Sequence, residues 1–135
     1  METQKKFKLW YDEKEGVVRG EIYQRFDAES LDEFYTEATK YTPEQQRYVV
    51  GWLFDDAQQM VDKEARKVAK EKGNLVHFEK MALIGAKPVI RMIAKIVMTA
   101  QGRGNSFKFC ATEEEALAWI REQKEIDKKA QASQG

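Results

Sequence analysis

Short apolar runs of strand length alternate along this 135-residue chain with longer stretches of helical periodicity. The runs at 47–54 and 80–85 are almost continuously apolar, as is typical of strands covered on both faces of a sheet. Each run is followed by a segment of helical length, at 55–74 and 86–102. Strands that alternate with helices favour right-handed crossovers and parallel pairing. The alternation therefore predicts an α/β fold.

The two ends of the chain complete this pattern. Residues 7–26 read as two strands around a polar turn at Gly16, which predicts an N-terminal β-hairpin. Near the other end, a short strand at 106–110 leads into a helix that opens with the capping box of Thr112 and Glu115. We expect a mostly parallel sheet of about five strands, with the N-terminal β-hairpin and about four helices, in the order β-β-α-β-α-β-α-β-α. Residues 1–126 should form a single domain, followed by a flexible tail at 127–135.

Charge is balanced in total and uneven along the chain. The 23 basic and 23 acidic residues cancel, which argues against a general polyanion binder. Residues 1–62 nevertheless carry 8 basic and 14 acidic side chains, whereas residues 63–111 carry 11 and 3. The middle segment therefore predicts a basic surface, if it is contiguous in space.

The cysteine content and the length of the apolar runs indicate the cellular compartment. The one cysteine, Cys110, has no partner for an internal disulfide. No run reaches the roughly 18 apolar residues that a membrane-spanning helix requires. We therefore expect a cytoplasmic protein.

The element order, together with the segments VVRGEIY, YVVGWLFDD, KMALIG and FKFCATEEEALAWI, resembles the STAS superfamily. The similarity is greatest to its anti-sigma-factor-antagonist-like branch, also described as STAS or CRAL-TRIO-like, which consists of small bacterial or archaeal proteins. It covers roughly residues 7–122. The resemblance implies a STAS-like domain that binds a protein kinase or an anti-sigma partner.

The same resemblance implies a switch at the start of the helix after the third strand, where antagonists are phosphorylated on Ser or Thr. The equivalent positions here are Asp55, Asp56 and Ala57, and no Ser or Thr occurs from Pro43 to Met98. A Ser/Thr phosphoswitch at this position is therefore chemically excluded. The two acids have two readings: they imitate a permanently charged state, or they only cap and fill the first turn of the helix.

The sequence does not indicate an enzyme. His77 and Cys110 are the only residues of their kinds, so a zinc site or a cysteine–histidine pair would require these two to meet. Asp55 and Asp62 are two helical turns apart, too far for one metal ion without further ligands. We predict no catalytic residues, no metal site and no cofactor.

The segment 88–100 is apolar over most of the circumference of its expected helix, which is more than an ordinary surface helix shows. Its excess apolar surface has three explanations: core packing, contact with a protein partner or in a homodimer, or contact with an apolar ligand or a membrane surface. The residues predicted to form this partner or ligand surface are Lys87, Val89, Arg91, Met92, Lys95 and Ile96.

Two functions remain open at this point. The first is a non-enzymatic interaction module that resembles anti-sigma-factor antagonists but lacks the phosphorylatable Ser or Thr. The second is a binder or sensor of a lipid-like or other apolar small molecule, held under the helix at 88–100. Nucleic acid is not expected, because the basic residues of the segment 57–72 are not interleaved with aromatic side chains.

Overall fold

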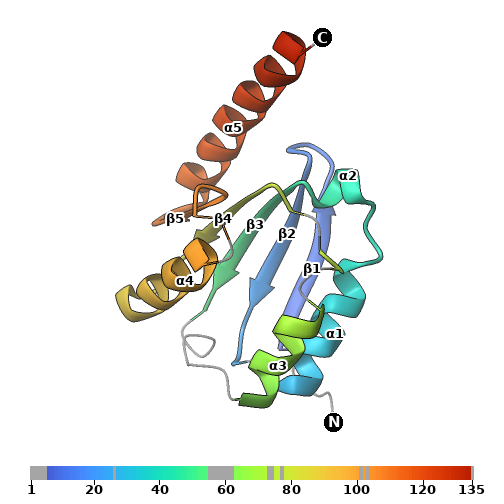
Figure 1. Cartoon of the computed structure of the whole chain (residues 1–135), viewed down its shortest axis with the longest axis vertical. Coiled ribbons are helices and arrows are strands. Elements are labelled where there is room, and N and C mark those ends of the chain that lie inside the picture. The colour runs from blue at the N-terminus through green and yellow to red at the C-terminus, as the bar shows by residue number, and fades with distance from the viewer. Residues whose placement is uncertain are drawn as a thin grey trace.

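The computed structural model describes residues 6–25, 27–54, 63–72, 75–76, 78–100, 102 and 104–134, and these form a five-stranded sheet with helices on both faces (Figure 1). The strands lie side by side in chain order, β1-β2-β3-β4-β5. Their bounds are β1 Phe7–Asp12, β2 Val17–Ile22, β3 Tyr48–Leu53, β4 Lys80–Ile84 and β5 Phe107–Cys110. The helices are α1 Ala28–Ala38, α2 Pro43–Gln46, α3 Lys63–Lys72, α4 Pro88–Ala100 and α5 Glu113–Gln134.

The α/β class, the five-stranded sheet and the N-terminal hairpin are confirmed, but the sheet is mixed rather than mostly parallel. β1 and β2 pair antiparallel, whereas β2–β3, β3–β4 and β4–β5 pair parallel. The described helices number five instead of about four, because residues 43–46 form the short helix α2. Pro43 occupies its first turn, and Thr42 caps it through a capping box with Gln45. Proline is compatible with the first turn because the amide it lacks would have no helical partner there.

α5 covers one face of the sheet, and the hydrophobic core lies between this helix and the strands. Its buried residues Ala116 and Ile120 pack in one cluster with the buried strand residues Val17, Tyr48, Val50, Ala82, Ile84 and Cys110. α1 lies on the opposite face, where Phe34 meets Phe7 with 5.4 Å between ring centroids. Figure 1 shows α3 and α4 on the same side as α1. This placement is the one that right-handed crossovers between successive parallel strands produce.

α5 extends well beyond its predicted end. The segment 127–135, predicted to be a flexible tail, is helical as far as Gln134. Tertiary contacts hold the part of α5 just before this extension: the Lys124 ammonium donates to the carbonyl oxygens of Glu15 and Gly16, and Arg121 pairs with Glu15. Gly16 has a φ of +67°, so the hairpin turn adopts a conformation that favours glycine.

The helix caps follow the local sequence signals. The hydroxyl of Thr112 accepts a hydrogen bond of 3.1 Å from the amide of Glu115, as predicted for the start of α5. Asp27 caps α1 by accepting from the amide of Ser30 at 2.8 Å. Among the described residues, no helix is both long and apolar enough to cross a membrane.

Candidate interaction surface

α4 presents an apolar stripe to solvent. Val89, Met92 and Ile96 are 53%, 58% and 63% exposed. Their spacing of three and four residues places them on one side of the helix. Large apolar side chains that gather in this way on a surface are typical of a contact site.

The remainder of α4 explains why its sequence is apolar over such a wide arc. Ile90, Ile93, Ala94 and Met98 are half-buried, so one side of the helix does turn toward the body of the protein. Arg91 and Lys95 are exposed and lie one turn apart at the edge of the apolar stripe, with Lys87 exposed just before the helix. One side of α4 is therefore half-buried against the protein, and the other side is exposed to solvent. The predicted partner or ligand residues Lys87, Val89, Arg91, Met92, Lys95 and Ile96 all fall on the exposed part.

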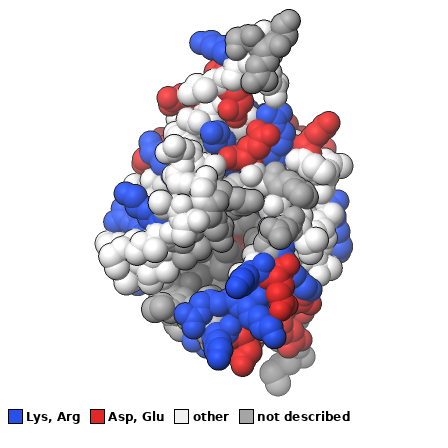
Figure 2. All heavy atoms as spheres, viewed as in Figure 1, with Lys and Arg blue, Asp and Glu red and all other residues white. Residues whose placement is uncertain are grey.

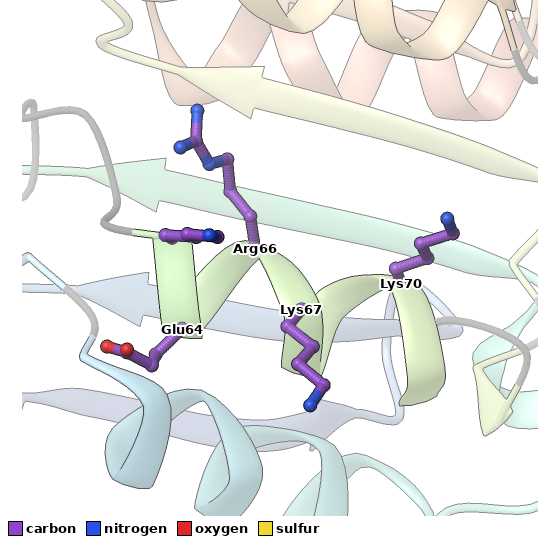
Figure 3. Close-up of a pocket in the computed structure, with 5 residues that line it drawn as sticks. Glu64, Arg66, Lys67 and Lys70 are labelled. Atoms are coloured by element: carbon purple, nitrogen blue, oxygen red, sulfur yellow. The ribbon is translucent and has the colours of Figure 1, made fainter.

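α3 carries a second surface, which is cationic. Lys63, Arg66, Lys67 and Lys70 follow the i, i+3, i+4, i+7 spacing of a single helical face and are all exposed, whereas Ala65 on the opposite face is fully buried. Together with Glu64 they line a cleft of about 470 Å³ (Figure 3). We call Lys63, Arg66, Lys67 and Lys70 the cationic face of α3.

Packing against α1 fixes the orientation of this face. α1 and α3 lie against one another, and Lys72 at the end of α3 pairs with Asp32 of α1. In Figure 2 the basic residues of α3 form a blue cluster, an uncharged surface lies over α4, and the molecule is hollowed between them. The basic cluster of α3 and the largely uncharged surface at α4 therefore lie on the same side of the molecule.

A third cluster joins the hairpin to α5. Arg19 forms ion pairs with Asp12, at 3.3 Å, and with Glu113, and its guanidinium lies 5.6 Å from the ring centroid of Trp10. The pKa of Asp12 is lowered, chiefly because its carboxylate accepts from the amide of Glu15 and also because of Arg19. Trp10, Arg19 and Glu113 border a cleft of about 90 Å³ beside Trp52. Because the charges are already paired with one another, this cluster ties the first turn of α5 to the hairpin.

A family model described as a domain of unknown function (DUF7793) matches residues 23–124. The chain belongs to this family. The match starts just after β2, ends within α5, and includes both α3 and α4. No curated protein matches the chain.

Within the DUF7793 chain, the other residues singled out from the sequence divide into two groups. Asp55, Asp56 and Ala57, which the STAS resemblance makes equivalent to the switch, lie outside the described residues, as does His77. Cys110 lies buried in the core, and burial raises the pKa of its thiol, so the thiolate that nucleophilic chemistry requires is disfavoured. Over the part of the chain that the structure describes, no group of three His, Cys, Asp or Glu side chains is placed to hold a metal ion.

Sequence reasoning did not select the cationic face of α3 as a site. The predicted site residues came from the segments 55–57 and 87–96, although the i, i+3, i+4, i+7 spacing of the four cations already placed them on one side of a helix. The ion pair that joins Arg19 to Glu113 was also not predicted, because the two residues are 94 positions apart in the sequence.

Proposed function

We propose that this protein is a non-enzymatic interaction module that binds a partner protein through α4. The observation that carries the proposal is the exposed stripe of Val89, Met92 and Ile96. Full burial of such a side chain stabilises a complex by about 1.5–3 kcal/mol, and each of these three retains more than half of its exposure in the free chain. Covering the stripe would therefore contribute a few kcal/mol to binding.

The resemblance to anti-sigma-factor antagonists supports the same class of function, since those proteins act by binding other proteins. The burial of Cys110 supports a non-enzymatic role, because the thiol lies in the core rather than in a cleft. The partner is a different protein or a second copy of this chain, and it meets Arg91 and Lys95 beside the stripe. Acidic side chains on the partner would complement these two cations.

The alternative, a lipid-like or other apolar ligand held under α4, stays a prediction. Two of the clefts found among the described residues are bordered chiefly by charged side chains, Lys63 and Arg66 in one and Glu44 and Arg47 in the other. That lining suits a polar partner better than an acyl chain.

Site-specific photo-crosslinking tests the proposal. A benzophenone amino acid at Met92 should capture one defined partner in cells that produce the protein, whereas the same group at Glu125, exposed on α5, should not. A band of twice the chain mass would identify the partner as a second copy. Equal capture at the two positions, or none at Met92, would refute docking through α4.

A substitution in the same stripe provides a second test of docking through α4. Met92→Asp should leave the unfolding midpoint nearly unchanged, because Met92 is 58% exposed, and should weaken binding of the purified partner by at least tenfold. Glu125→Lys is the matched control and should bind normally. If Met92→Asp unfolds the chain, the stripe belongs to the core and the proposal fails.

A further inference from the structure

The cationic face of α3 is an unusual arrangement for a helix that has no partner. Its four cations form neighbouring like-charged pairs at spacings of three and four residues: Lys63 with Arg66 and Lys67, and Lys70 with Arg66 and Lys67. Like charges at these spacings repel and destabilise a helix. The arrangement is explained if an anion covers the face.

No acid of the described chain relieves this repulsion by pairing with the face. Ion pairs are formed by other cations nearby, including Lys72 with Asp32 and Lys40 with Glu37, but within the described residues none involves the four cations of this face. Among the described residues that border the cleft, Glu64 is the one acid beside four cations. This part of the lining therefore carries an excess of positive charge, which attracts an anion.

The size and surroundings of the cationic face restrict which kind of anion can bind to it. Lys63 and Lys70 are seven residues apart, which corresponds to about 10 Å along the helix axis. α1 packs directly against α3 and carries the exposed acids Glu29 and Glu33. The negative charge that these residues add to the neighbouring helix disfavours an extended polyanion, such as a nucleic-acid duplex or an anionic bilayer. A short anionic segment matches the two turns of α3 over which the four cations are spread.

We propose that the cationic face of α3 binds a short acidic segment of a protein, with carboxylates spaced over about two helical turns. This inference rests on the proposed function, since the segment belongs to the partner that α4 anchors. Figure 2 shows the basic cluster of α3 and the uncharged surface over α4 on one side of the molecule, so a single partner can reach both. The apolar stripe of α4 provides anchoring, and the cationic face of α3 selects an acidic partner and accelerates its association.

NMR titration of the full chain with a synthetic peptide tests this assignment. The probe is a 15-residue alanine-rich helix with four glutamates at i, i+3, i+4 and i+7, and the matched peptide carries glutamines instead. The acidic peptide should shift the amide signals of residues 63–72, and its affinity should fall at least tenfold between 50 and 300 mM salt. Equal binding of the glutamine peptide, or signals that shift outside this region alone, would overturn the inference.

Charge-reversal variants determine whether peptide binding depends on the position of the cations or only on the net charge of the protein. Arg66→Glu with Lys70→Glu should weaken peptide binding at least tenfold, and the milder pair Arg66→Gln with Lys70→Gln about threefold. The control, Lys128→Glu with Lys129→Glu, makes the same charge change at exposed positions of α5 and should bind almost normally. Equal losses in the reversal variant and in the control would show attraction by net charge only and would contradict the inference.

Two further probes separate this inference from its alternatives and from the proposed function. Vesicles of phosphatidylcholine and phosphatidylserine at 7:3, or a 20-base-pair duplex, should bind more weakly than the peptide; tighter binding that requires Arg66 and Lys70 would overturn the choice of a protein segment. Met92→Asp should leave peptide binding unchanged while it weakens binding of the purified partner at least tenfold. If crosslinking at Met92 succeeds and the peptide fails to bind, the docking role of α4 stands and the acidic segment is rejected.

Discussion

Tyr48, the first residue of β3, donates a hydrogen bond of 2.7 Å from its hydroxyl to Oδ2 of Asp127 in α5. The Lys124 ammonium lies 5.2 Å from the centroid of the same ring. This contact joins the end of the sheet to a part of α5 that lies beyond the predicted end of the domain. Burial, reinforced by the hydrogen bond to Asp127, raises the pKa of Tyr48.

The raised pKa of Tyr48 predicts alkaline sensitivity. In the unfolded chain this phenol loses its proton near pH 10, whereas the folded protein retains it, so its contribution to stability is complete below pH 10 and is lost as the pH rises further. Tyr48→Phe should reduce the loss of stability between pH 10 and 11.5. Urea unfolding at pH 8 and pH 11 measures the difference. A variant whose stability falls as steeply as that of the wild type would contradict this role.

The lowered pKa of Asp27 predicts that the protein loses stability at acid pH. Its carboxylate accepts from the amide of Ser30 and pairs with Lys6 at 3.0 Å, and the first of these contacts is the main reason why its pKa is lowered. The contribution of Asp27 is therefore present above about pH 4, the ordinary aspartate value, and is lost as the pH falls toward the lowered pKa. Asp27→Asn preserves a capping side chain without a titrating group. Thermal melts between pH 6 and 2.5 should show a smaller change for the variant, and parallel curves would exclude Asp27 as a source of the acid sensitivity.

Two isoleucines of α5 provide a matched test of where the core lies. Ile120 is 1% exposed within the core cluster, whereas Ile126 is 49% exposed. Ile120→Ala should lower the free energy of unfolding by about 2–5 kcal/mol, because it removes buried methyl groups and leaves a cavity. Ile126→Ala should cost less than about 1 kcal/mol. Chemical denaturation of the two variants gives both values, and similar losses would place the core elsewhere along α5.

Gly85 connects β4 to the turn before α4, and its substitution should disturb the position of that helix. It has a φ of +83°, and a Cβ there would lie 3.0 Å from the carbonyl oxygen of Leu53. Gly102 has a similar φ of +74° but open space around it. Gly102→Ala should therefore lower the free energy of unfolding by about 1 kcal/mol, because only backbone strain is added. Gly85→Ala should lower it clearly more, because the new Cβ also meets the carbonyl oxygen of Leu53. Equal losses in denaturant unfolding would show that the contact with Leu53 relaxes at no cost.

Local periodicity explains which elements could be predicted. The hairpin around Gly16, the strand ending at Cys110 and the cap at Thr112 each depend on residues within a few positions of one another, so their patterns are visible without a fold. The short helix α2 was not predicted, because its four residues span little more than one turn and show no helical period. The helical course of residues 127–134 was not predicted either: the contact at Asp127 comes from Tyr48, which is distant in sequence.

The same distinction applies to the candidate surfaces. The amino-acid sequence by itself determined that α4 is apolar over a wide arc and that four cations share one face of α3, because side-chain spacing on a helix follows from its pitch. Only the tertiary structure decided that Val89, Met92 and Ile96 face solvent. It also decided that, within the described residues, Lys72 of α3 pairs with Asp32 of α1 whereas the four cations of the cationic face form no ion pair. Exposure and ion pairing depend on which elements pack together, and that depends on contacts between residues far apart in the chain.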